Sequence, residues 1–138
     1  MHLNFYTEKR HAAKWQNNYY TGQKMIVSKQ NAEHYNWGGD CDGWHLVKGS
    51  SLHIIHEKMP AGRREQRHYH CVAQQFFFVL AGELTMELEG EFYVVSAGEG
   101  ISVPPQARHQ ARNESSDNTE FLVISEPTTR GDRINQEE

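Results

Sequence analysis

The chain has 138 residues, a formal net charge of −4 and a sequence pI near 6.1. This length suits a single domain that buries about two thirds of its unfolded surface. Because the charge balance is acidic and the Lys and Arg residues are scattered, we expect no nucleic-acid partner. The longest apolar run, Phe76 to Ala81, is too short to cross a bilayer, and no apolar export signal is visible near the start. We therefore expect a cytoplasmic protein that does not contact a membrane.

The first 23 residues are rich in Asn, Gln, Lys and aromatic side chains, among them Trp15, Tyr19 and Tyr20. Burying one aromatic ring is worth about 2 kcal/mol. We therefore predict that residues 1–23 form an arm or a short helix that packs on the rest of the chain or on a partner subunit.

Residues 24–127 have the pattern of one all-β domain. Apolar residues recur with period two or in short blocks, and Gly and Pro interrupt the chain often. The segment Glu89-Gly90-Glu91 is typical of a hairpin turn. Many short strands separated by turns favour a sandwich, a jelly roll or a closed barrel. The predicted strands are Lys24–Lys29, Trp44–Lys48, Leu52–Met59, Gln75–Ala81, Leu84–Leu88, Phe92–Val95, Ile101–Val103, His109–Asn113 and Thr119–Ser125.

The predicted strand Leu52–Met59 carries three polar side chains that suit proton transfer. With period two, His53 and Glu57 share one face with Ile55, and His56 lies on the other face. Whichever face turns inward, an imidazole or a carboxylate then lies inside the domain. We name His53, His56 and Glu57 as candidate catalytic acids or bases. The alternative is that one face is simply solvated.

Three histidines form a candidate metal site. His68 and His70 are two residues apart, so an extended segment places both imidazoles on one face. His109 follows on a separate predicted strand. Neutral imidazole is a common ligand of Zn, Ni, Fe and Mn ions. Cys71 should point away from the face of His70, and we predict that it and Cys41 are free thiols.

The glycines and prolines around these histidines resemble the two motifs of the cupin superfamily, across residues 44–125. The first motif, G-x5-H-x-H-x3-4-E-x6-G, corresponds in spacing to Gly62, His68, His70, Gln75 and Gly82. The second motif, G-x5-P-x-G-x2-H-x3-N, corresponds in spacing to Gly98, Pro104, Gln106, His109 and Asn113. The resemblance implies a double-stranded β-helix, the cupin jelly-roll barrel, here with an N-terminal arm. It also implies one divalent transition metal, Zn, Ni, Mn or Fe, held inside one end of the barrel by the three histidines.

Two positions depart from these motifs. Gln75 stands where the family usually has glutamate, and Gln106 where it usually has glycine. A glutamine carbonyl supplies an oxygen without a charge, so the ion would keep its full 2+ and be a stronger Lewis acid. We predict Gln75 as the fourth metal ligand. The alternatives are that Gln75 lies beside the ion without contact, or that a one-residue shift turns Gln74 inward instead. Gln106 would resist a positive φ at the turn.

The alternation around Gln75 also predicts a pocket wall and an interface. If Gln75 faces the ion, Phe77 faces the interior, and Phe76, Phe78 and Leu80 point outward. Exposing three such side chains together is costly. We therefore predict a homodimer, with cover by the N-terminal arm as the alternative.

Residues 128–138 form a polar C-terminal tail, and we predict that its residues Arg130 to Glu138 are frayed. Its tripeptide Arg130-Gly131-Asp132 matches an adhesion motif, which we interpret as ordinary tail sequence.

The predicted function is that of a small metal-dependent enzyme, with the ion as Lewis acid on a small polar or anionic metabolite. An isomerase, lyase or cyclase would suit this chemistry. The alternatives are a metal-dependent dioxygenase and a non-catalytic cupin that binds a sugar or another small molecule. The fold alone does not choose among them.

Overall fold

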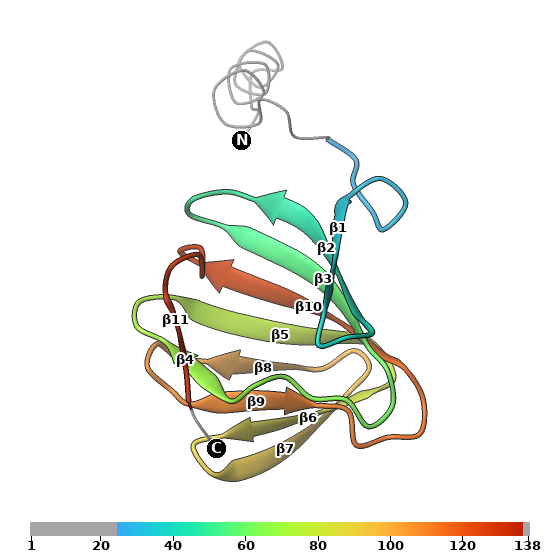
Figure 1. Cartoon of the computed structure of the whole chain (residues 1–138), viewed down its shortest axis with the longest axis vertical. Coiled ribbons are helices and arrows are strands. Elements are labelled where there is room, and N and C mark those ends of the chain that lie inside the picture. Colours follow the sequence, from blue (N-terminus) through green and yellow to red (C-terminus); the bar gives the residue numbers. More distant parts are fainter. Residues whose placement is uncertain (1–24, 137–138) are drawn as a thin grey trace, which may run out of the picture.

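Two antiparallel sheets face one another in the computed structural model, which describes residues 25–136 (Figure 1). The predicted N-terminal arm lies outside the described residues. The six-stranded sheet contains, in spatial order, β1 (Glu33–Trp37), β2 (Cys41–Lys48), β3 (His53–Met59), β10 (Thr119–Glu126), β5 (Gln74–Ala81) and β8 (Gly100–Val103). The five-stranded sheet contains β11 (Arg133–Asn135), β4 (His68–His70), β9 (His109–Arg112), β6 (Glu83–Leu88) and β7 (Glu91–Ser96). The predicted all-β jelly roll is confirmed, and residues 25–136 contain no helix able to span a membrane.

The core lies between the two sheets and follows the period-two pattern. Phe77 of β5 and Val123 of β10 are buried cross-strand partners, and Phe121 beside them is completely buried. Phe76 and Leu80, on the other face of β5, are exposed, as the alternation predicted. The core cluster consists of Cys41, Met59, Phe77, Val79, Leu84, Met86, Val95, Val103, Ala107, Ala111, Phe121 and Val123.

The candidate ligands lie at one end of the barrel interior, beyond the apolar core. Along β10 the inward residues change from Phe121 and Val123 to Ser125, which pairs with Gln75 of β5 and with His53 of β3. Along β10 and β5 the interior therefore changes from the packed core to polar side chains. These polar side chains gather at one end of the interior, where the candidate ligands lie.

Among residues 25–136, Glu89 and Gln106 are the two non-glycine residues with a left-handed backbone conformation, and both lie in turns. The β6–β7 hairpin turns through Glu89 (φ 49°) and Gly90 (φ 89°), as its sequence predicted. Gln106 adopts φ 69°, so the turn keeps the left-handed conformation although a glutamine stands where the family usually has glycine. A left-handed non-glycine residue costs about 1–2 kcal/mol. The Gln106 backbone N–H donates to the His70 carbonyl at 2.6 Å, and this hydrogen bond ties the turn to the strand of the candidate ligands.

The predicted first strand is wrong. Met25–Lys29 form a bend and the start of a turn, and the first strand is β1. The backbone N–H of Ser28 donates to Oδ1 of Asn31 at 2.9 Å, and the Asn31 N–H donates to the Ser28 carbonyl at 3.1 Å. Local hydrogen bonds of this kind compete with strand pairing.

The predicted frayed tail is also wrong. Residues 133–135 form β11 and pair with β4. Just before β11, the Asp132 carboxylate accepts backbone N–H groups from Cys71 (3.0 Å), Val72 (3.1 Å) and Ala73 (2.9 Å). A charged acceptor that satisfies three N–H groups holds this polar segment in place despite its low hydrophobicity.

Candidate metal centre

Three buried histidines from two paired strands lie together at the polar end of the barrel. His68 and His70 come from β4, and His109 comes from β9, where it pairs directly with His68. One ring nitrogen from each histidine lies within 4.8 Å of the corresponding nitrogens of the other two. All three side chains are at least nine-tenths buried. The structure therefore brings together the three residues predicted from spacing.

The hydrogen bonds of the histidines leave nitrogen lone pairs free for an ion. A backbone carbonyl can only accept, so Nδ1 of His68 donates to Gln66 O (2.8 Å) and Nδ1 of His109 donates to Ala107 O (2.9 Å). In both rings Nε2 then carries the lone pair. Within residues 25–136, Nε2 of His109 and both ring nitrogens of His70 are buried without a hydrogen-bond partner. Buried polar atoms are rarely left unpaired, so this donor set fits a metal ion.

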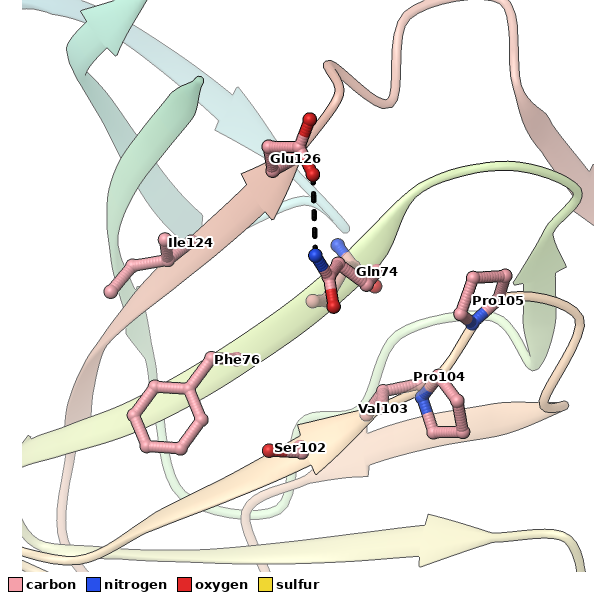
Figure 2. Close-up of a pocket in the computed structure, with 9 residues that line it drawn as sticks. Gln74, Phe76, Ser102, Val103, Pro104, Pro105, Ile124 and Glu126 are labelled. Atoms are coloured by element: carbon pink, nitrogen blue, oxygen red, sulfur yellow. Dashed lines mark hydrogen bonds between the residues drawn. The ribbon is translucent and has the colours of Figure 1, made fainter. Parts of the chain in front are cut away.

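Gln75 points an unpaired oxygen into the same region. Its side chain is buried, and its Nε2 donates to Oγ of Ser125 at 3.1 Å. Its Oε1 has no partner among the described residues. Gln74, the register alternative, is exposed and donates to the Glu126 carboxylate at 3.2 Å, as Figure 2 shows. Gln75 therefore turns inward and Gln74 turns outward.

Burial keeps the histidines neutral. It lowers the pKa of both His68 and His70 to about 4, and it also lowers the pKa of His109. The charge of Arg133 adds to this effect on His68, and the neighbouring His68 adds to it on His70. Only the neutral imidazole binds a metal, so the three rings are ready to act as ligands at neutral pH.

Metal affinity should be nearly constant from about pH 7.5 to about pH 5.5, because protons compete poorly for these rings. At about pH 5.5, two ligands with the ordinary imidazole pKa would lose about a hundredfold in affinity. With pKa values of about 4, His68 and His70 stay neutral, and the affinity should fall by less than about threefold. Calorimetric titration with Zn²⁺ at the two pH values measures the difference. A hundredfold loss would contradict the lowered pKa values.

A cavity of about 190 Å³ adjoins the histidines. It is smaller than the pockets that hold drug-sized molecules, which indicates a small ligand. Its lining mixes apolar and ionisable side chains. The lining residues are Tyr35, Ile55, Glu57, Glu65, His68, His70, Gln75, Phe77, Val123, Ser125, Thr129 and Arg133.

Glu57 is the one candidate acid or base that lines this cavity. The Tyr35 hydroxyl donates to its Oε1 at 3.4 Å. Burial raises the pKa of the Glu57 carboxyl to about 8, and the nearby Glu65 carboxylate raises it further, against the opposing effects of Tyr35 and Arg133. At neutral pH Glu57 is therefore mostly protonated and is poised to give up or take a proton.

His53 and His56 are not brought to the cavity. His53 is buried on the inner face of β3, where its Nε2 lies 3.0 Å from Nδ1 of His45 and the two rings stack. His56 lies on the outer face, 2.9 Å from Glu120 and edge-on to Trp44. Neither imidazole lines the space beside the three histidines.

Three ionisable residues of the cavity wall were missed from the sequence. Tyr35 lies on β1, whose sequence EHYNW has no clear apolar alternation. Glu65 lies before β4, where its Oε1 accepts the Ala111 N–H at 3.0 Å and lies 4.0 Å from Nδ1 of His68. Arg133 belongs to the segment that was predicted to be frayed. No pattern in the sequence marks them as one group.

A second hollow, of about 460 Å³, lies outside the barrel on the six-stranded sheet. Figure 2 shows Phe76, Ile124 and Ser102 along it, with the Gln74–Glu126 hydrogen bond at one end. Its surface is mostly apolar. It lacks the cluster of ionisable groups found at the inner cavity, so the inner cavity is the candidate active site.

The family model described as "Cupin domain" matches residues 55–125, just over half of the 138 residues. The chain is a cupin. "Polyketide synthase CurC" of Streptomyces cyaneus is 30% identical to this cupin over 69 residues, which are 50% of this chain and 45% of that protein. The chain spans less than two thirds of the length of the curated relatives it matches.

Solved cupin structures share the fold of this chain. An RmlC-like cupin from Shewanella frigidimarina superposes with a TM-score of 0.71 at 20% identity, over 79% of this cupin and 96% of that chain. Pac13 of Streptomyces, described as a unique nucleoside dehydratase, has a TM-score of 0.69 at 18% identity, over 83% of this cupin and 92% of that chain. At these identities the likeness establishes the fold alone.

Proposed function

We propose that this cupin binds one divalent transition-metal ion, Zn, Ni, Mn or Fe, through His68, His70, His109 and Gln75. We further propose that it acts on a small polar or anionic metabolite as an isomerase, lyase or cyclase. The observation that carries the proposal is the convergence of buried, unpaired donor atoms from His70, His109 and Gln75 beside a small cavity. The description of Pac13 as a dehydratase supports this class, because dehydration is a lyase reaction.

The ion, when bound, supplies Lewis acidity that polarises a substrate oxygen. Three neutral imidazoles and one neutral amide add no negative charge to the site, which favours Lewis-acid chemistry. Glu57 faces the same cavity and is mostly protonated at neutral pH. As the carboxylic acid it donates a proton to the substrate, and as the carboxylate it accepts one. Tyr35 orients this carboxyl through its hydroxyl. Phe77 and Val123 limit the water around the reacting groups.

Elemental analysis of the purified chain tests the proposal. The wild type should hold close to one equivalent of metal after incubation with Zn²⁺, and His109→Ala should hold less than about a tenth, because it loses one of the three imidazoles. Glu57→Gln is the matched control, since it changes the cavity without removing a proposed ligand, and it should keep the metal. The proposal fails if the wild type takes up no ion or if His109→Ala binds as much as the wild type.

We also propose that the chain forms a homodimer through the outer face of the six-stranded sheet. Phe76 and Leu80 are 38% and 43% exposed there, and the outer hollow lies beside Phe76. Covering these side chains would remove apolar surface from water. Sedimentation equilibrium of the full chain should therefore give twice the mass of 16.0 kDa. Phe76→Glu should shift the protein to the monomer, and a monomeric wild type at high concentration would refute the dimer.

A further inference from the structure

The C-terminal strand β11 places Arg133 directly opposite a candidate metal ligand. In the antiparallel pair of β11 with β4, Arg133 lies opposite His70 and Asn135 lies opposite His68. Side chains directly opposite one another in such a pair lie on the same face of the sheet. Arg133 consequently lines the inner cavity at its solvent-exposed side, whereas Ile134 between the two points to the opposite face.

The positive charge of Arg133 has no ionic partner within residues 25–136. Its Nε donates to Oδ1 of Asn135 at 2.7 Å, and its Nη2 makes a long contact of 3.5 Å with the Gln66 carbonyl. Three other arginines of the described residues form ion pairs: Arg63 with Asp40, Arg67 with Glu87 and Arg112 with Glu114. Of the residues that line the cavity, Arg133 is the only Lys or Arg.

The bond to Asn135 fixes one edge of the guanidinium and leaves other N–H donors for a ligand. A guanidinium has five N–H donors in a planar fork, which matches the oxygens of a carboxylate or a phosphate. Glu65 also lines the cavity, but it forms no ion pair with Arg133. An unpaired guanidinium on the lining favours binding of an anion. The neutral metal-ligand set does not supply that negative charge.

We propose that Arg133 binds an anionic oxygen group of the substrate, a carboxylate or a phosphate, while the reacting part of the same molecule lies at the three histidines. This inference rests on the proposed function, because it assigns a second contact to the substrate of that site. The small volume of the cavity restricts the substrate to a small organic acid or phosphate ester.

Calorimetric titration of the Zn²⁺-loaded full chain with three probes tests this assignment. The probes are glycolate, 2-phosphoglycolate and the neutral glycolamide. Arg133→Gln should weaken binding of at least one anionic probe by about tenfold or more, because it removes a charge-assisted hydrogen bond. It should leave the metal content and glycolamide binding unchanged. The anion with the larger Arg133-dependent loss identifies the group as carboxylate or phosphate.

Arg130→Gln is the matched control, since Arg130 is an exposed arginine in the same segment and does not line the cavity. It should bind the probes as the wild type does.

Arg133→Lys keeps the charge but lacks the planar fork of N–H donors. It should weaken binding of the same anion less than Arg133→Gln does, and it is the test variant if Arg133→Gln does not fold. The inference is overturned if the metal-loaded wild type binds neither anion, if Arg133→Gln or Arg133→Lys binds them as tightly as the wild type, or if Arg130→Gln causes the same loss. A wild type that takes up no Zn²⁺ would instead overturn the proposed function.

Discussion

Gln75→Glu should tighten binding of a divalent ion by about ten- to a hundredfold. The inward position of Gln75 leaves its Oε1 unpaired beside the three histidines, and a carboxylate there adds a negative charge next to the ion. Without metal the same charge would lie buried near Glu57 and Glu65, which also line the cavity. The metal-free variant should therefore melt at a lower temperature than the metal-free wild type.

Two measurements on matched proteins check this result. Calorimetric titration with Zn²⁺ gives the affinity, and thermal unfolding with and without a chelator gives the stability gained from the ion. Gln74→Glu is the control, because Gln74 is the preceding residue and its side chain points outward to Glu126. It should leave the metal affinity unchanged. A larger gain for Gln74→Glu than for Gln75→Glu would show that the other register holds the ion.

Asp132→Ala should lower the free energy of unfolding by about 2–4 kcal/mol, because three backbone N–H groups lose a charged acceptor. These N–H groups belong to Cys71, Val72 and Ala73, which directly follow β4. The loss should also loosen β11 and reduce metal affinity, since His70 ends the strand that Asp132 holds.

Urea unfolding and Zn²⁺ titration measure the two effects of Asp132→Ala. Asp117→Ala is the control, because the Asp117 carboxylate makes no hydrogen bond with the described part of the chain. It should leave both quantities close to the wild-type values. Asp132→Asn keeps one acceptor oxygen and should fall between Asp132→Ala and the wild type. Unchanged stability in Asp132→Ala would show that the tail does not support the strand of the histidines.

Most central strands of the barrel could be predicted from local pattern. In β5 and β10 alternate residues are buried, because neighbouring side chains of a strand point to opposite faces. The turn residues Glu89-Gly90-Glu91 predicted the β6–β7 hairpin. The strands that were missed, β1, β4 and β11, are polar, so no hydrophobic alternation predicts their pairing. They form because neighbouring strands and the Asp132 carboxylate supply partners for their backbone.

For the candidate catalytic residues, the period-two pattern predicted only part of the arrangement. It grouped His53 with Glu57 and separated them from His56, but it did not tell which face turned inward. The pairing of β3 with β2 and β10 decides that Glu57 faces the cavity and that His56 meets Glu120 outside. Even on the inner face, His53 contacts His45 instead of the three histidines.

The sequence by itself determined the all-β cupin fold and the three histidines, since these depend on short spacings within strands and turns. It left open whether Gln75 or Gln74 turns inward, and the structure shows that Gln75 does. Only the tertiary structure decided that Tyr35, Glu65 and Arg133 share one cavity beside the candidate ligands. These three residues come from an outer strand, a loop and the C-terminal strand. Their meeting depends on which strands pair across the two sheets, and such long-range pairing is set by the packing of the whole barrel.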